Sequence, residues 1–298
     1  MNPRKLLWKL EYLLLRGIAG VINALSMEHS TFIVKNIADF VFLLIPSRRK
    51  IAVNNLTIAY GDSLSEKEKE RIAREAFRNF IISLMEFFRI PSMLREAQRR
   101  FRFVGMENFE RAISKGHGVI LVISHLGSWE YLGFLAYLTQ YPCSVIVKQI
   151  QNPYINRWIQ NLRTETKLNP IDKKNSVREI FLELKKNNVV AILIDQWAGR
   201  DGVASDFFGE VTSTTSIPFR IAKKTGAVLI PGYCLRTGVG HYNIVIQPEV
   251  TIDEEDSKED QERKTTLKLN QLLEKQILKY PEQWLWTHRR WKEMKVLQ

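Results

Sequence analysis

A histidine and a glutamate five positions apart are the residues of this sequence best suited to acid–base chemistry. His125 follows an apolar run at residues 119–124, and Glu130 ends the string Ser-His-Leu-Gly-Ser-Trp-Glu. A carboxylate that hydrogen-bonds one imidazole nitrogen fixes the tautomer and leaves the other nitrogen free to take a proton. We therefore predict that His125 is a general base and that Glu130 folds back across a turn to orient it.

The same pair also has a purely structural interpretation, which the spacing leaves open. A histidine can simply end a strand, and a glutamate at the start of a helix is favoured by the helix dipole. No serine or cysteine stands in a nucleophile-elbow sequence such as Gly-x-Ser-x-Gly. If the site is catalytic, we expect direct attack by a substrate hydroxyl without a covalent enzyme intermediate.

Two residues after another apolar run are expected beside His125. Asp195 and Gln196 follow the run 189–194 directly, so they should lie at the same edge of a sheet, as candidate substrate contacts. Gly209 stands in a loop that we place near the donor end of the substrate. The alternatives are a turn-capping aspartate and a glycine required only by backbone shape.

Two cationic side chains are candidate anion contacts. Arg163 belongs to the helix-like segment 153–166, and its guanidinium offers a planar, permanently charged fork for a phosphate or a developing oxyanion. Lys148, just after the apolar run 145–147, is a second candidate. Ordinary solvated surface charge explains either residue equally well.

The predicted strands and helices that carry these residues alternate along the chain. Short apolar runs alternate with helix-like segments, which predicts an α/β fold with a central, mostly parallel sheet covered by helices. In such sheets, ligands bind outside the carboxyl ends of the strands, where His125 is expected. A long helix over 64–90 should begin with a capping box formed by Ser65 and Glu68. The predicted strands are 119–123, 145–147, 189–194, 228–230 and 242–246.

The amino-terminal region is basic and amphipathic. Residues 1–50 hold eight Lys or Arg (positions 4, 5, 9, 16, 35, 48, 49, 50) against three acids (positions 11, 28, 39), interleaved with apolar residues. No uninterrupted apolar run reaches the roughly 20 residues that a spanning helix needs. We predict membrane-associated amphipathic helices in residues 1–46, followed by one α/β domain in 47–298. Core helices of a soluble domain are the open alternative.

The composition narrows the functional classes. Lys and Arg number 44 against 32 Asp and Glu, a net charge of +12 that attracts nucleic acid, anionic lipid or an acidic protein alike. Two cysteines cannot build a disulfide framework or a four-ligand zinc site, and we predict no metal site. Trp284, Trp286 and Trp291 stand beside Arg289, Arg290 and Lys292, a composition typical of a lipid interface. His288, in the same stretch, is expected at lipid headgroups or without a role.

Four ordered motifs resemble one enzyme family. The string 124–130 is similar to the His-x4-acid signature of the lysophospholipid acyltransferase superfamily, and its flanks resemble the bacterial lipid A biosynthesis (late) acyltransferases. Residues 49–56 with 85–89, the block 195–231 and the stretch 280–292 resemble the amino-terminal, central and carboxy-terminal regions of that family. The resemblance thus covers nearly the whole chain.

The resemblance implies a specific reaction. A fatty acyl chain moves from an acyl carrier protein thioester to a hydroxyl of a lipid A precursor, as a secondary acylation, without metal or organic cofactor. By position, His125 is the base and Glu130 its partner. The implied partners are acyl carrier protein, the lipid A precursor and the anionic surface of the inner membrane, at its cytoplasmic face. An implied fold is that of glycerol-3-phosphate acyltransferases, with an apolar groove that we expect to run toward the amino-terminal helices.

Two other functions compete with this one. An acyltransferase acting on another glycolipid or on a lysophospholipid shares the signature, although the Glu-Gly-Thr-Arg phosphate motif expected for lysophosphatidic acid is absent. A basic nucleic-acid-binding protein would satisfy the charge. It requires a reader module that the sequence does not show, so we expect no nucleic-acid partner.

Overall fold

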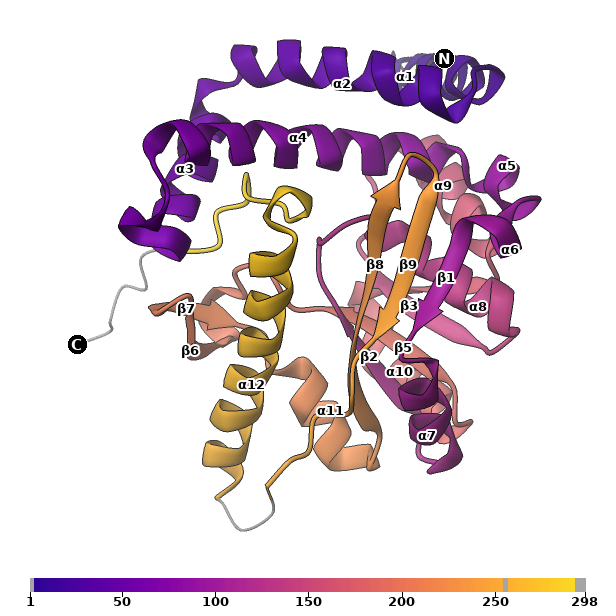
Figure 1. The fold of residues 1–298 in the computed structure, drawn as a ribbon. Helices are drawn as coiled ribbons and strands as arrows, with labels where there is room; N and C mark the ends of the chain where they lie inside the picture. The colour runs from indigo at the N-terminus through magenta and orange to yellow at the C-terminus, as the bar shows by residue number, and fades with distance from the viewer. Residues whose placement is uncertain (1–2, 254–256, 293–298) are drawn as a thin grey trace.

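The computed structural model describes residues 3–253 and 257–292 and is built around a seven-stranded sheet. The strand order is β1-β9-β8-β2-β5-β3-β4, and only β8 and β9 pair antiparallel (Figure 1). The predicted α/β class with a mostly parallel sheet is confirmed. The strands are β1 (Phe101–Val104), β2 (Val119–Ile123), β3 (Cys143–Val147), β4 (Leu168–Asp172), β5 (Val189–Leu193), β8 (Val228–Gly238) and β9 (His241–Ile246).

The two central strands are apolar on both faces because helices cover both sides of the sheet. All five residues of β2 are buried, as are the first four of β5. One face is covered by α7, α8 and α9, the other by α10, α11 and α12. Ile123 pairs with Leu193 at the carboxyl ends of β2 and β5. His125 and Asp195 therefore each stand two residues beyond an aligned pair.

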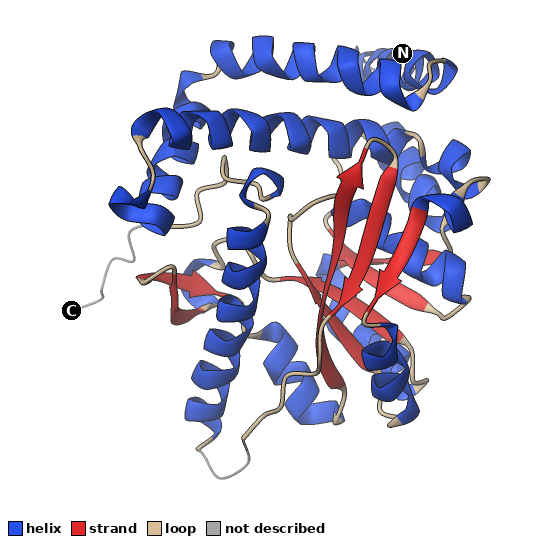
Figure 2. Ribbon diagram, in the orientation of Figure 1, coloured by secondary structure: helices blue, strands red, loops and turns tan. Residues whose placement is uncertain are grey.

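Helices form a layer above the sheet in addition to covering its two faces (Figure 2). The longest, α4, spans the upper edge, and α2 packs along it. The α-helices are α1 (Pro3–Ala24), α2 (Met27–Leu44), α3 (Pro46–Tyr60), α4 (Glu66–Phe88), α5 (Ile90–Leu94), α6 (Ala97–Arg100), α7 (Met106–Ser114), α8 (Gly133–Thr139), α9 (Pro153–Glu165), α10 (Ser176–Lys185), α11 (Ile217–Thr225) and α12 (Lys258–Lys279).

The start of α4 follows the prediction and its end differs slightly. Ser65 and Glu68 form the expected capping box. The helix stops at Phe88 with Arg89 as its C-cap, while Pro91 sits in the first turn of the next helix, α5. A proline is tolerated there because the first turn of a helix has no acceptor for its missing N–H.

A hairpin replaces the loop expected around Gly209. Strands β6 (Val203–Phe207) and β7 (Glu210–Thr214) pair antiparallel outside the main sheet. Phe208 and Gly209 connect them, both with positive φ (57° and 76°). Two central residues of positive φ make the tight turn that suits a hairpin's twist, which is why glycine is placed here.

The amino-terminal helices expose much apolar surface. Within the described part of the chain, no single helix is long and apolar enough to cross a membrane; only residues 27–44 with 46–63 pass as a pair, bent by 94°. The boundary expected at residue 46 falls where α2 gives way to α3. Residues 1–2 and 293–298, at the ends of the two predicted domains, lie outside the described residues.

Candidate active site

The imidazole of His125 is held by the carboxylate of Asp195. Nδ1 of His125 lies 2.9 Å from Oδ1 of Asp195, and the backbone N–H of His125 donates to Oδ2 at 2.8 Å. The two residues are 70 positions apart but follow neighbouring parallel strands, β2 and β5. The sequence prediction that Asp195 and His125 share one edge of the sheet is confirmed.

Asp195 is fixed from a third direction and shielded from water. Its side chain is 2% exposed, and Oδ2 also accepts a hydrogen bond of 3.0 Å from the indole Nε1 of Trp284. Burial opposes ionisation of this carboxyl, but the His125 charge and these hydrogen bonds outweigh it and hold its pKa below the usual value. Burial works against the protonated His125 too, yet Asp195 raises the pKa of the imidazole above 6.5.

This arrangement leaves the second nitrogen of His125 available for proton transfer. An ionised carboxylate can only accept, so the proton of the neutral ring stands on Nδ1 and the lone pair on Nε2. The amide Nε2 of Gln196 lies 3.5 Å from that nitrogen. The ring of Trp129 packs against the imidazole edge, with centroids 5.1 Å apart. His125 is thus oriented as a general base.

The prediction that Glu130 contacts and orients His125 is wrong. The Glu130 carboxylate instead accepts two hydrogen bonds from Arg163, from Nε at 3.0 Å and Nη2 at 2.6 Å. Glu130 stands in a short 3₁₀ helix, Trp129–Leu132, and its carboxylate contacts Arg163 of α9. Its charge still contributes to the raised pKa of His125, after burial and Asp195. A catalytic role for Glu130 stays a prediction, but the orienting carboxylate is that of Asp195.

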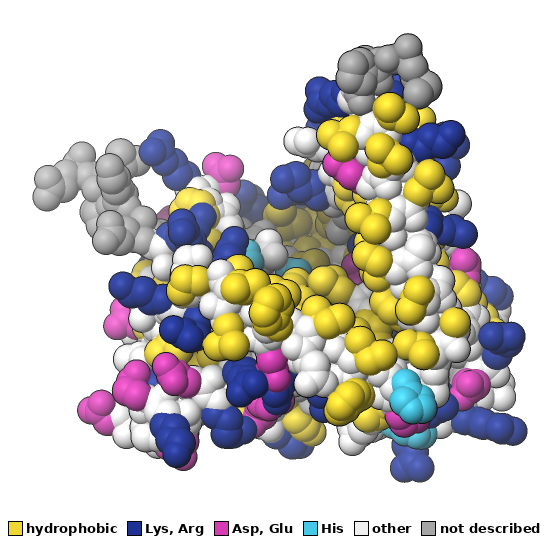
Figure 3. Space-filling view, turned by 90° about the horizontal axis from the view of Figure 1, so that it is seen from above, with side chains coloured by type: hydrophobic (Ala, Val, Ile, Leu, Met, Phe, Trp, Pro, Cys, Tyr) yellow, Lys and Arg dark blue, Asp and Glu magenta, His cyan; other side chains and the backbone are white. Residues whose placement is uncertain are grey.

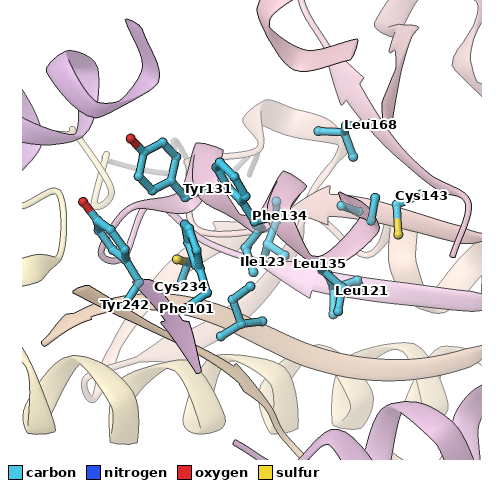
Figure 4. Packing of buried hydrophobic residues seen from close by; sticks show 14 of the residues in the cluster. Phe101, Leu121, Ile123, Tyr131, Phe134, Leu135, Cys143, Leu168, Cys234 and Tyr242 are labelled. Carbon is cyan, nitrogen blue, oxygen red and sulfur yellow. The ribbon is translucent and has the colours of Figure 1, made fainter. Parts of the chain in front are cut away.

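An apolar cavity of about 200 Å³ opens at His125. It runs under α8 along one face of the sheet, because alternate residues of β2, β5 and β3 point to the same side. Figure 4 shows five of its lining side chains, Leu121, Ile123, Leu135, Cys143 and Leu168. The expected groove toward the amino-terminal helices is corrected, since the cavity runs into the sheet–helix core and its described lining includes no residue of α1 or α2.

The charged candidates divide between the cavity and the rest of the fold. Glu130, Arg163 and Lys148 all line the cavity that contains His125. Gln196 lies at the imidazole and is exposed. Gly209 is confined to the hairpin turn, where added Cβ would meet nothing within 4 Å.

A buried ion pair beneath the His125 turn was missed by sequence reasoning. Arg236 of β8 donates to both Glu86 oxygens, at 2.7 and 2.6 Å, and to the hydroxyl of Ser128 at 2.9 Å. Ser128 and Tyr242 donate to Glu86 in turn, at 2.6 and 2.7 Å. A glutamate and an arginine inside otherwise apolar runs, 85–88 and 233–236, were the available signal. The network ties α4 to the turn that carries Ser128.

Part of the carboxy-terminal stretch expected at a lipid interface packs beside the site instead. Trp284 and Trp286 are 1% and 0% exposed, so the tryptophan-rich composition marks a packed core here. Leu285 donates its N–H to the carbonyl of His125 at 3.2 Å. Arg290, fully buried, donates to the carbonyl of Gln196 at 3.2 Å. The stretch therefore braces both strand ends that carry the catalytic candidates.

The described residues hold no group of three or more His, Cys, Asp or Glu side chains placed to bind a metal ion. The side chains of the site are suited to general-base chemistry beside an apolar cavity. A hydroxyl and the acyl carbon of a long-chain substrate fit that combination.

Comparisons with known proteins point the same way. The model of the bacterial lipid A biosynthesis acyltransferase family matches residues 4–293. The chain is 28% identical to the lipid A biosynthesis palmitoleoyltransferase of Escherichia coli K12 over 84% of its length and 80% of that protein's. It is 29% identical to the lauroyltransferase of the same strain, over 82% and 79% respectively. A phosphatidylinositol mannoside acyltransferase of Mycobacterium tuberculosis is 27% identical over 52% of this chain and 51% of its own.

Proposed function

The chain belongs to the bacterial lipid A biosynthesis acyltransferase family, and on that premise we propose a specific reaction for it. It transfers a fatty acyl chain from an acyl carrier protein thioester to a free hydroxyl of a lipid A precursor, as a secondary acylation. The observation that carries this proposal is the His125–Asp195 pair at the mouth of an apolar cavity.

The proposed chemistry uses one imidazole in both directions. Nε2 of His125 takes the proton of the acceptor hydroxyl as its oxygen attacks the thioester carbonyl carbon. When the tetrahedral intermediate collapses, the carbon–sulfur bond breaks and the departing thiolate takes that proton back from His125. Asp195 stabilises the imidazolium between the two steps, as a buried carboxylate does beside a catalytic histidine.

The acyl chain occupies the cavity in this proposal. Its lining beyond the mouth is made of Leu, Ile, Val, Ala and Cys side chains. Each methylene that leaves water there contributes about 0.8 kcal/mol, so a closed cavity selects for chain length. The carbonyl carbon then lies near His125 at the open end.

The polar residues at the mouth suit an anionic substrate. Arg163 is neutralised by Glu130, whereas Lys148 lines the same mouth from the end of β3. A lipid A precursor and the phosphopantetheine arm of a carrier protein both bring phosphate. We propose that Lys148 and Arg163 contact phosphate and that Gln196 contacts the reacting hydroxyl.

Membrane attachment through α1 and α2 completes the proposal, with the enzyme at the cytoplasmic face of the inner membrane. Figure 3 shows hydrophobic side chains gathered over these two helices, beside a hollow with histidine atoms at its floor. Cationic residues flank the apolar ones, as in helices that lie in an anionic lipid surface. The exposed apolar residues are Leu6, Leu7, Leu10, Leu13, Leu14, Ile18 and Val21 on α1, and Phe32, Ile33, Ile37, Phe40, Leu43 and Leu44 on α2.

A second acceptor class has one specific observation in its favour. The similarity to the phosphatidylinositol mannoside acyltransferase covers about half of each chain. A mannosylated phospholipid would offer the same hydroxyl and phosphate chemistry as a lipid A precursor. It is the alternative acceptor in the assay below.

The test of the reaction uses purified full-length protein in lipid vesicles. Acyl carrier protein and coenzyme A thioesters are each offered with a lipid A precursor or with a mannosylated phosphatidylinositol, and products are identified by mass spectrometry. We expect acyl transfer to the lipid A precursor from the carrier protein thioester, and none above background with the His125→Ala variant. Transfer only to the mannolipid would overturn the proposed acceptor, and equal use of coenzyme A would overturn the proposed donor.

The test of membrane attachment is sedimentation with vesicles. Leu14→Glu with Phe40→Glu places two charges on side chains that are 69% and 63% exposed. We expect at least a roughly tenfold weaker partition into phosphatidylglycerol-containing vesicles, because buried charge in the interface is costly. Val177→Glu, 65% exposed on α10, is the matched control and should bind like the parent protein. Equal binding by all three proteins would refute this surface.

A further inference from the structure

A second imidazole, that of His288, lies beside the His125–Asp195 pair. His288 stands between Leu285, whose N–H donates to the carbonyl of His125 at 3.2 Å, and Arg290, whose guanidinium donates to the carbonyl of Gln196 at 3.2 Å. The sequence pattern assigned no chemistry to this residue.

The backbone around His288 is fastened to the catalytic elements at several points. Leu285 donates its N–H to the carbonyl of His125, and His288 donates its own N–H to the carbonyl of Leu285 at 3.3 Å. The carbonyl of His288 accepts from Asn55 at 2.7 Å and from the N–H of Arg290 at 2.9 Å. These contacts fix the backbone from which the imidazole of His288 extends.

The two nitrogens of His288 have different surroundings. Nδ1 is buried and has no hydrogen-bond partner among the described residues. Nε2 has no partner among them either, but it is not enclosed. A buried N–H without an acceptor is rare in native proteins. The proton of the neutral ring therefore belongs on Nε2, the nitrogen that is not enclosed, which makes His288 a hydrogen-bond donor without a partner among the described residues.

The electrostatic setting keeps this donor neutral. Burial lowers the pKa of His288 below 6.5, and the charges of His125, Lys292 and Arg290 act in the same direction against the contribution of Asp195. A neutral imidazole near a developing negative charge donates a hydrogen bond without giving up its proton. His288 is thus unsuited to replace His125 as the base.

The reaction needs such a donor, and of the two cations at the mouth Arg163 already has protein partners, while Lys148 is proposed to contact phosphate. Arg163 is committed to Glu130 and to Gln160. The side chain of Trp197, two residues after Asp195, has a buried Nε1 with no partner among the described residues. Neither Trp197 nor His288 belongs to the described lining of the acyl cavity.

We propose that His288 donates its Nε2–H to the thioester carbonyl oxygen as negative charge develops on it, which rests on the proposed acyl transfer. The oxygen gains charge when the acceptor hydroxyl attacks and loses it when the thiol leaves. The hydrogen bond stabilises the negatively charged intermediate more than the bound substrate, so its removal lowers kcat and leaves KM nearly unchanged.

The experiment compares two amide substitutions that differ in where they place an N–H. The amide nitrogen of His288→Gln reaches the position of Nε2, whereas that of His288→Asn reaches only the position of Nδ1. We expect His288→Asn to lower kcat by about 10²–10³-fold with KM within about twofold, as for loss of one oxyanion donor. His288→Gln should retain at least a tenth of the parental kcat. His241→Asn, on β9 away from the site, is the matched control and should keep full activity.

Three outcomes overturn this inference without affecting the proposed function. One is a parental kcat in His288→Asn, and a second is an equal loss in both His288 variants that tracks a lowered melting temperature. A raised KM with normal kcat also overturns it, because that result assigns His288 to substrate binding alone. If the parent protein transfers no acyl chain, or His125→Ala remains active, the proposed function fails instead.

Discussion

Two carboxylates near the candidate base His125, those of Asp195 and Glu130, make different contacts. Asp195 is buried and gives its oxygens to the side chain and backbone of His125 and to Trp284. Glu130 is partly exposed at the cavity mouth and gives both oxygens to Arg163. Asp195 sets the tautomer of the base, whereas Glu130 sets the position of a cation. The carboxylate that contacts the imidazole is therefore the one 70 positions away in the sequence, and not the one five positions away.

The largest loss of activity is expected for Asp195→Asn. The amide preserves the shape but favours the wrong tautomer of His125, so kcat should fall by about 10³–10⁴-fold. The turnover of purified protein in vesicles measures it, with circular dichroism to show that the fold persists. Activity within about tenfold of the parent would place the orienting group elsewhere.

A smaller effect should come from Glu130→Gln. Arg163 then loses its partner at the mouth, which we expect to cost about 10–100-fold in kcat/KM. A double-mutant cycle with Arg163→Gln should show strong coupling, because the two side chains share one ion pair.

The matching cycle of Glu130→Gln with Asp195→Asn should be close to additive, since those carboxylates share no hydrogen bond. Strong coupling between the two carboxylates, together with none between Glu130 and Arg163, would restore the originally expected His125–Glu130 contact.

Selection for acyl chain length tests the role of the cavity separately from that of Asp195. Cys143→Leu fills the cavity from the start of β3, and we expect the preferred acyl chain to shorten, with a roughly tenfold change in the ratio of kcat/KM for long over short chains. Cys234→Ala, at the other buried cysteine and outside the cavity lining, is the control. An unchanged ratio in Cys143→Leu would mean that the chain binds elsewhere.

The pH dependence gives the finest comparison. Because the pKa of His125 is raised, kcat/KM of the parent should fall as pH drops through a value above 6.5, where the base becomes protonated. Asp195→Asn removes the main opposition to burial, so this limb of the residual activity should move to lower pH. Glu130→Gln should move it in the same direction by less, since its charge contributes last. A larger shift in Glu130→Gln would reverse the ranking of the two carboxylates.

Much of the fold was predictable because local signals and the tertiary structure agree. The apolar runs at β2 and β5 became the central strands, and the capping box began α4. The strand β4 escaped notice because Asn169 and Pro170 interrupt its apolar pattern at the sheet edge. The hairpin around Gly209 has too polar a sequence to resemble strands.

The site was predictable only where topology alone decides proximity. Parallel strands bring Asp195 to His125, and the sequence placed both at one edge for that reason. The side-chain partner was wrong because the direction of Glu130 depends on a 3₁₀ turn that no spacing rule specifies. Trp284 and His288 were not recognised as parts of the site because the contacts that bring them there join residues far apart in the chain.

Whether Asp195 orients His125 for proton transfer can be measured by nuclear magnetic resonance of protein labelled with ¹⁵N-histidine. We expect a proton on Nδ1 of His125 with a strongly downfield resonance. That signal should persist in Glu130→Gln and disappear in Asp195→Asn. A signal that vanishes in Glu130→Gln and survives in Asp195→Asn would show that Glu130, and not Asp195, orients the imidazole.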